Sequence, residues 1–283
     1  MTSDHDDLSP TIETPGAAAA AGGTDATASG PDPEGSGAGG GRPGAQGPST
    51  GQARGLAVRT RGLSLRGARG WVFHGVDLDV PAGGLAAVSG IAGSGRTALL
   101  LTLGGRMRPT EGSGTVGGLR LDKDPRAVQR VAALGLVPGV NELDPALTVR
   151  EHVDEALALH EGVLGRFRGR DARVRHALER VGLDVDPGAR ADELAPDEAR
   201  LLGAALALVG SSSRRLLAGP VAEPGLLLLD DVDEGLPADR QHALWQRLRA
   251  IAASGVTVVA ACHDPAPAEG LAIPVPLSHD PSL

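Results

Sequence analysis

Alternating apolar and polar residues mark the first ordered segments of the chain. Leu56–Thr60 and Leu63–Leu65 alternate, and Val76–Val80 does so strictly before the turn Pro81–Gly84. A period of two places the apolar side chains on one face of a strand. We therefore predict half-exposed antiparallel strands here, and they lead into a buried strand at the apolar run Leu85–Val88.

The period lengthens to that of a helix between about residues 148 and 215. Thr148 and Glu151 have the spacing of a capping box, in which each side chain satisfies the backbone N–H of the other residue. Apolar residues then recur at helical intervals from Val153 and again from Val174. A third helix is predicted to begin at Pro196, because proline is tolerated in a first turn.

The pattern returns to strands near the C-terminus. Gly225–Asp231 is a short apolar run that ends in carboxylates, and Gly255–His263 is a β-branched run that ends in a histidine. A predicted helix, Gln241–Ala252, separates them. This alternation predicts an α/β fold with a mostly parallel core sheet, an antiparallel β subdomain and a helical insertion at about residues 140–215.

Composition divides the chain at about residue 55. Residues 1–55 consist largely of Gly, Ala, Pro, Ser and Thr, with seven acidic residues against two arginines. Such a segment buries too little apolar surface to offset the entropy of ordering, so we predict a disordered tail, either a tether or a solubilising extension. Residues 56–283 suffice for one sizeable core.

Charge and residue usage exclude several classes of function. The net charge is −8 and no basic run is present, which argues against a nucleic-acid surface, and aromatic residues for base stacking are scarce. Cys262 is the only cysteine, so no internal disulfide is possible, as suits a reducing cytoplasm. The acidic N-terminus is unlike a signal peptide, and no apolar stretch is long enough to span a membrane.

A glycine-rich segment between the predicted strand at 85–88 and a helix-like run at 98–103 is the clearest chemical signal. Its spacing, Gly-x-x-x-x-Gly-Arg-Thr, is that of a phosphate-binding P-loop, whose backbone N–H groups turn inward around an anion at a helix N-terminus. Arginine stands where lysine is usual, and Lys123 is the only lysine of the chain. The predicted nucleotide-binding residues are Gly90, Ile91, Ala92, Gly93, Ser94, Gly95, Arg96 and Thr97.

Two strand ends supply candidate catalytic groups. Asp230 and Thr97 are the candidate ligands of a magnesium ion, and Asp231 is placed to polarise an attacking water. His263 is a candidate hydrogen-bond partner of a terminal phosphate. The alternatives are that the two aspartates simply end a strand in a surface loop and that the histidine is structural.

The order of these motifs resembles that of the ATP-binding subunits of ABC transporters, especially bacterial drug-export systems. The resemblance covers roughly residues 56–265. Besides the P-loop and Leu226–Asp231, it includes Pro81–Gly83, Arg108–Gly112, Leu147–Glu151, Leu194–Glu198 at the signature position and Gly255–His263. It implies ATP and Mg²⁺ as cofactors, a separately encoded multi-span permease as partner, a dimer with itself or a second ATP-binding subunit, and a cytoplasmic position on the inner face of the plasma membrane.

The chain departs from the family pattern at the positions that serve turnover. Arg96 replaces the lysine that reaches the phosphates, and the planar guanidinium is not equivalent to it. Gly139 stands in place of the glutamine that binds metal and water, with Asn141 and Glu142 as candidate substitutes. Asp231 stands for the catalytic glutamate and is one methylene shorter, and Pro237 replaces an aspartate.

The signature segment departs most. The family's Leu-Ser-Gly-Gly-Gln clamps ATP across a dimer, but here Ala195 offers no hydroxyl and Pro196 no N–H. Asp197 and Glu198 would repel phosphate oxygens, so an ordinary helix cap is the better interpretation. Trp71 is the aromatic residue best placed to stack on adenine, with strand-edge packing as its alternative.

Two hypotheses follow. The first is an ATP-binding subunit that couples ATP binding, with slow hydrolysis or none, to the permease. The second is a non-catalytic interaction module with a vestigial nucleotide site. A small-molecule kinase is a weaker third possibility, because the chain supplies no acceptor-binding motif and the matches at Thr148–Glu151 and Gly255–His263 would stay unexplained.

Overall fold

The computed structural model describes residues 55–137, 141–165, 169–212 and 224–278. The predicted disordered tail therefore falls outside the described residues, except for Gly55. The alternating segments lie in two strands of a four-stranded antiparallel sheet, whose order is β2-β1-β4-β5. Its strands are β1 (Val58–Gly67), β2 (Gly70–Val80), β4 (Glu111–Val116) and β5 (Leu119–Arg120).

The boundaries of this sheet differ from those predicted. Both predicted segments, 56–60 from Val58 onward and 63–65, fall in one strand, β1, whose pairing with β2 shifts register between Thr60 and Leu63. That irregularity breaks the period of two, which explains why the sequence pattern looked like two strands. β2 begins at Gly70 rather than near Val76, so Trp71 lies within it.

A five-stranded parallel sheet forms the core, in the order β6-β7-β8-β3-β9. Its strands are β3 (Leu85–Ser89), β6 (Ala132–Leu134), β7 (Leu226–Leu229), β8 (Thr257–Cys262) and β9 (Ile273–Pro276). The strands predicted at 85–88, 226–229 and 256–262 are therefore confirmed, and so is the α/β fold class. Neither β6, β9 nor the short helix α2 (Pro125–Val131) was predicted, because each is too brief to show a period.

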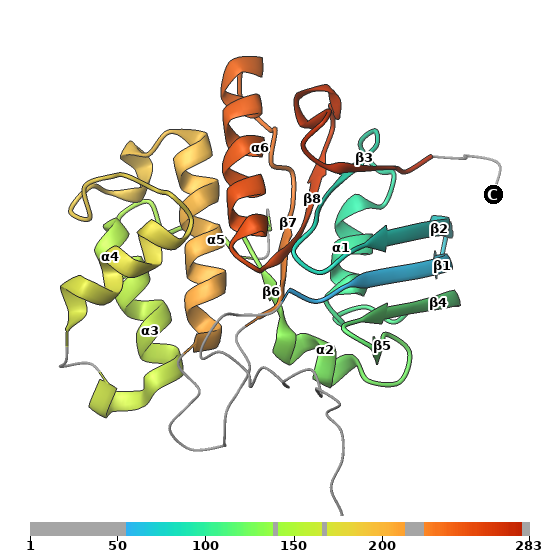
Figure 1. Cartoon of the computed structure of the whole chain (residues 1–283), viewed down its shortest axis with the longest axis horizontal. Coiled ribbons are helices and arrows are strands. Elements are labelled where there is room, and N and C mark those ends of the chain that lie inside the picture. The colour runs from blue at the N-terminus through green and yellow to red at the C-terminus, as the bar shows by residue number, and fades with distance from the viewer. Residues whose placement is uncertain (1–54, 138–140, 166–168, 213–223, 279–283) are drawn as a thin grey trace, which may run out of the picture. The chain divides into compact units, whose positions relative to one another are not determined.

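Alternate residues of the parallel strands pack into two separate cores. Leu227 and Val258 contribute to a core shared with four helices, whereas their neighbours Leu226 and Val259 face the core shared with α1 (Arg96–Leu103) and the antiparallel sheet. The four helices are α3 (Val149–Gly165), α4 (Arg170–Arg180), α5 (Pro196–Ser212) and α6 (Ala238–Ala253). Figure 1 shows α5 and α6 on one side of the parallel strands and α1 with β1, β2 and β4 on the other. Burial on both faces explains the continuous apolar runs of these strands.

The sequence predicted α3, α4 and α5 from their apolar period, and it predicted α6 at Gln241–Ala252, within the observed bounds. The capping box at the start of α3 is confirmed: the Thr148 N–H donates to Glu151 Oε2 over 2.8 Å, and the Glu151 N–H donates to Thr148 Oγ1 over 3.2 Å.

Candidate functional site

The predicted P-loop joins β3 to α1 (Arg96–Leu103), as the sequence pattern required. Gly95 precedes the helix with φ of 88°, in the left-handed region that favours glycine. A Cβ atom there would lie 2.2 Å from the Val72 carbonyl oxygen, so no other residue fits between the loop and β2. The loop is thus held close against β2 and presents the N-terminus of α1, where backbone N–H groups favour an anion.

Thr97 and Asp230 lie next to each other although 133 positions separate them in the sequence. The Thr97 hydroxyl donates a hydrogen bond to Asp230 Oδ2 over 2.6 Å. Thr97 comes from the first turn of α1 and Asp230 from the carboxyl end of β7, so the parallel sheet brings the two oxygens to one edge. Both are hard oxygen ligands of the kind that Mg²⁺ prefers, so this pair fits a magnesium ion held beside phosphate.

The environment of Asp230 opposes its negative charge. Burial raises the pKa of this carboxyl above its ordinary value, and the neighbouring charge of Asp231 adds to the rise. The hydrogen bond from Thr97 acts in the opposite direction. The nearby charge of Arg96 also lowers this pKa, and a bound divalent cation would favour the ionised form further.

Arg96 connects the P-loop to the other two catalytic candidates. Its Nη2 lies 2.7 Å from His263 Nε2 and 3.0 Å from Asp231 Oδ1. The Asp231 contact meets the distance of an ion pair but not the angle of a hydrogen bond, so Oδ1 stays without a hydrogen bond to the described residues. His263 Nδ1 lies 3.9 Å from the same carboxylate oxygen. The structure therefore brings all three residues together, with the guanidinium turned toward the strand ends.

Two buried donors around the loop support an anion site. Ser94 Oγ and Arg96 Nη1 find no hydrogen-bond partner among the described residues, and the Arg96 side chain is only 7% exposed. Unpaired buried donors are costly, and a bound polyphosphate would supply the missing acceptors. The residues present therefore fit a nucleotide phosphate, provided that Arg96 exchanges its contacts with Asp231 and His263 for phosphate oxygens.

Sequence reasoning missed Asp233. Its side chain is 4% exposed, and its Oδ2 accepts hydrogen bonds from the backbone N–H groups of His263 and Asp264 over 2.7 and 2.8 Å. Its Oδ1 lies 3.3 Å from His263 Nδ1. The available signal was a third carboxylate in the segment Asp230-Asp231-Val232-Asp233, two residues after Asp231.

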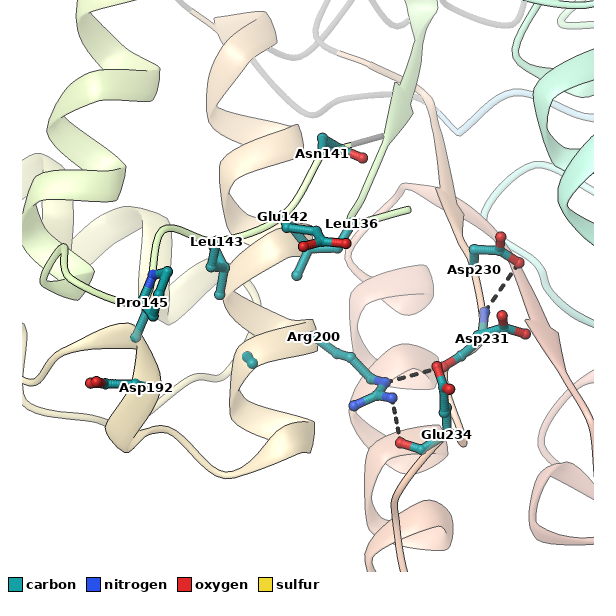
Figure 2. Close-up of a pocket in the computed structure, with 12 residues that line it drawn as sticks. Leu136, Asn141, Glu142, Leu143, Pro145, Asp192, Arg200, Asp230, Asp231 and Glu234 are labelled. Carbon is teal, nitrogen blue, oxygen red and sulfur yellow. Dashed lines mark hydrogen bonds between the residues drawn. The ribbon is translucent and has the colours of Figure 1, made fainter. Parts of the chain in front are cut away.

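A second missed residue, Arg200 of α5, holds the backbone of Asp231. Asp231 has φ of 40°, and it is the one non-glycine residue with positive φ in the described segments. Arg200 Nε donates to the Asp231 carbonyl oxygen over 3.2 Å, and Nη2 donates to the Glu234 carbonyl oxygen (Figure 2). This conformation costs roughly 1–2 kcal/mol, so Arg200 helps to retain a strained turn at the carboxylate expected to polarise water.

A cavity of about 330 Å³ adjoins these carboxylates rather than the P-loop. Figure 2 shows Arg200 and Glu234 on one side and, on the other, the labelled residues Leu136, Asn141, Glu142, Leu143 and Pro145. Acidic side chains dominate its polar lining: Glu142, Asp192, Asp230, Asp231 and Glu234, with Arg200 as the basic member. This charge disfavours phosphate, so the cavity fits water beside Asp231 better than the nucleotide itself.

The signature segment forms a closed helix start. The Ala195 N–H donates to Glu198 Oε2 over 2.9 Å, and Arg240 Nη1 of α6 donates to Asp197 Oδ1 over 2.8 Å. Both acids thus have partners inside the chain. The arrangement matches the ordinary helix cap expected from the sequence.

The remaining candidates have separate environments. Trp71 lies on β2 with the Arg66 guanidinium 5.2 Å from its ring centroid, and the His74 ring is 4.7 Å away. A role in stacking on adenine stays a prediction. Asn141 donates to the Gly135 carbonyl oxygen and accepts from the Val137 N–H, each over 2.9 Å, so its side chain braces the loop.

Three further positions complete the comparison with the sequence predictions. Gly139 lies outside the described residues. Pro237 forms the N-cap of α6. Cys262 is buried directly before His263, and burial raises the pKa of its thiol to about 12, so this cysteine is a poor nucleophile.

Comparison with known proteins gives consistent matches. A family model described as ABC transporter matches residues 73–231, which is more than half of the chain. Nod factor export ATP-binding protein I of Burkholderia lata is 32% identical over 198 residues, 68% of this chain and 58% of that protein. The ABC transporter ATP-binding protein YknY of Bacillus subtilis is 28% identical, over 69% of this chain and 79% of that protein. The chain thus spans somewhat more than half the length of the Nod factor export relative.

Solved structures show the same fold. The protein cbiO1 from Clostridium perfringens, part of the ABC transporter complex cbiONQ, matches with a TM-score of 0.60 and 19% identity, over 75% of this chain and 80% of that one. The ATP-binding cassette MJ0796, solved as a dimer with ADP and phosphate, matches with a TM-score of 0.55 and 21% identity, over 75% and 90%. At these identities the likeness concerns the fold.

Proposed function

This chain belongs to the ATP-binding subunits of the ABC transporter family, and we propose that ATP binding in its P-loop drives a separately encoded membrane permease. The observation that carries the proposal is the contact between Thr97 and Asp230 at the P-loop end of the sheet, 2.6 Å between oxygens. In this proposal the two residues hold Mg²⁺, while residues 90–97 surround the phosphates and Trp71 stacks on adenine.

Hydrolysis is proposed to be slow. Asp231 is the residue placed to polarise water, with His263 beside the terminal phosphate, but the Asp231 carboxylate pairs with Arg96. Because the guanidinium must leave before phosphate and water take their places, each turnover begins with the loss of an ion pair. A carboxylate one methylene shorter than glutamate also places water less well, and about 1 Å of misplacement costs roughly 100-fold in rate.

The partner side of the proposal comes from the relatives. The protein cbiO1 is part of a transporter complex, and MJ0796 was solved as a dimer. For this chain we propose a multi-span permease as partner, a dimer with itself or a second ATP-binding subunit, and a place on the cytoplasmic face of the plasma membrane. In the described segments, no helix combines the length and apolar character needed to cross a membrane.

The transport direction is proposed to be export. A relative named for Nod factor export supports that direction, and the drug-export type remains the proposed class. We assign residues 56–283 to the ATP-binding domain, with a helical insertion at about 140–215, and residues 1–55 to a disordered tail. The acidic signature is proposed to be unable to clamp a partner's ATP, because Asp197 and Glu198 lie in the first turn of α5 and their charges oppose a phosphate there.

Isothermal titration with the non-hydrolysable analogue AMP-PNP tests the proposal. Saturable micromolar binding that requires Mg²⁺ supports it, whereas the absence of saturable binding favours the non-catalytic interaction module with a vestigial site. Measured ATP turnover close to that of a family member with lysine and glutamate at the two altered positions would contradict slow hydrolysis.

A further inference from the structure

Asp233 holds both the backbone and the ring of His263. Its Oδ2 accepts the N–H groups of His263 and Asp264, while its Oδ1 faces His263 Nδ1 at 3.3 Å. The carboxylate is almost fully buried and lies behind the histidine with respect to Arg96. One side chain therefore fixes where the histidine sits and what its inner nitrogen contacts.

The contacts of the ring also fix its proton. A guanidinium has donors only, so the 2.7 Å contact between Arg96 Nη2 and His263 Nε2 requires that Nε2 accept. A neutral imidazole then carries its proton on Nδ1, where it donates to Asp233 Oδ1. The Nδ1–H group thus faces a carboxylate acceptor, and the Nε2 lone pair faces a guanidinium donor.

We propose that Asp233 is a positioning residue of the nucleotide site, which sets the tautomer of His263 and through it holds Arg96 on the ends of β7 and β8. With Nδ1 protonated toward Asp233, Nε2 offers a lone pair that retains the guanidinium and cannot donate to a phosphate. When Arg96 turns toward the P-loop, it loses its hydrogen bond to this acceptor. The tautomer is inferred from the contacts of His263 with Arg96 and Asp233. Its effect on nucleotide affinity rests on the proposed function.

The variant Asp233→Asn is expected to reverse the tautomer of His263. Two backbone N–H groups converge on the Oδ2 position, so the amide oxygen of asparagine must occupy it. The amide NH₂ group then faces His263 Nδ1 as a donor, which forces Nδ1 to accept and moves the ring proton to Nε2. Nε2–H then meets the donors of Arg96, and the bond between these residues is lost.

Long-range ¹H–¹⁵N correlation spectra of the ring nitrogens in the nucleotide-free chain test the proposal. His263 is assigned by comparison with His263→Gln, in alkaline buffer where imidazole is neutral. We expect the Nδ1–H form in the wild type and the Nε2–H form in Asp233→Asn. The same tautomer in both proteins would overturn the proposal.

Two further variants make the test decisive. Asp264→Asn removes the same charge one position away and keeps an acceptor for the Ala266 N–H, so it should retain the Nδ1–H form. Arg96→Ala removes the outer donor and leaves Asp233 in place. Retention of Nδ1–H in Arg96→Ala shows that Asp233 sets the tautomer, whereas a change to Nε2–H would overturn that assignment even if Asp233→Asn failed to fold.

A second measurement follows the consequence for Arg96. Asp233→Asn should bind Mg²⁺·AMP-PNP roughly fivefold more tightly than the wild type, because the guanidinium no longer loses a hydrogen bond on binding. A changed tautomer with unchanged affinity would overturn the link to Arg96. If the wild type shows no saturable binding, the proposed function fails, and the NMR result still decides the role of Asp233.

Discussion

Two helix starts in this chain use their polar groups in opposite ways. At the start of α1, Ser94 Oγ and Arg96 Nη1 are buried donors without partners in the described structure, and Thr97 meets Asp230. At the start of α5, Glu198 accepts the Ala195 N–H and Arg240 pairs with the neighbouring acid. The start of α1 therefore leaves hydrogen-bond donors available for an anion, whereas the start of α5 carries acidic side chains.

The contrast between the two helix starts suggests that the chain keeps its own nucleotide-binding loop and lacks a signature that could take part in ATP turnover. A helix N-terminus attracts phosphate only where its N–H groups and dipole are not already compensated by acidic side chains. The start of α1 meets that condition because its first turn carries no acidic side chain, and the start of α5 does not. We therefore expect nucleotide affinity to depend on the P-loop, with little contribution from the signature segment.

The largest expected effect comes from the cation pair. Thr97→Ala and Asp230→Asn should each weaken Mg²⁺·AMP-PNP binding roughly 10- to 100-fold, because each removes an interaction with charged groups. Isothermal titration measures the change, and Thr97→Ser, which keeps the hydroxyl, is the matched control. Asp197→Ala should change affinity by less than about twofold, since that acid is paired with Arg240. Equal losses at the P-loop and at Asp197 would break the contrast between the two helix starts.

Arg96→Lys should give the next largest effect. A lysine cannot reproduce the planar contacts that the Arg96 guanidinium makes with His263 and Asp231. Its ammonium group therefore gives up less interaction energy when it turns from these residues to a bound phosphate. We expect AMP-PNP to bind roughly five- to tenfold more tightly than to the wild type. Arg96→Ala is the control for the charge itself and should bind more weakly. A weaker complex with lysine would show that the guanidinium already serves the phosphates.

A smaller effect concerns the stability of the nucleotide-free chain. Burial raises the pKa of Asp230, so the folded state favours the protonated form. The stability linked to this carboxyl is present below its unfolded pKa and is lost as the pH rises through the higher folded value. Without Mg²⁺, Asp230→Asn should therefore melt a few degrees above the wild type at pH 7, by differential scanning calorimetry, and the two should converge in acid. A lower melting temperature at pH 7 would argue that Asp230 stabilises the nucleotide-free fold.

The smallest effect is expected at the second helix start. Arg240→Ala removes the partner of Asp197 and should lower the free energy of unfolding by less than about 1 kcal/mol, because the arginine is half exposed. Urea unfolding followed by circular dichroism measures this change, and the affinity for AMP-PNP should stay the same. A large loss of affinity in this variant would mean that the signature takes part in binding.

The sequence predicted the parts of the fold whose patterns are long and regular. The buried strands, α3 to α6 and the capping box at Thr148 have strong periods or fixed spacings, and the structure confirms them. The brief elements β6, β9 and α2 escaped because three to seven residues carry no usable period. The register shift in β1 escaped because a bulge breaks alternation without breaking the strand.

The candidate site shows the same limit. The contact between Thr97 and Asp230 followed from motif order and from the rule that parallel strands present their carboxyl ends at one edge. The roles of Asp233 and Arg200 depend on which side chain faces which backbone group, and no spacing rule specifies that. The pairing of Arg96 with His263 and Asp231 escaped for the same reason.

The most direct test of the central claim is electron paramagnetic resonance of Mn²⁺ added with AMP-PNP to the wild type and to Asp230→Asn. AMP-PNP alone chelates Mn²⁺, so the loss of free-ion signal beyond that in a protein-free mixture measures the metal that the protein holds in place of Mg²⁺. If Thr97 and Asp230 hold the cation of a nucleotide in the P-loop, the wild type takes up one Mn²⁺ only when AMP-PNP is present, and Asp230→Asn takes up far less at the same concentrations. Equal uptake by the two proteins, or nucleotide binding by the wild type without metal, would contradict the account.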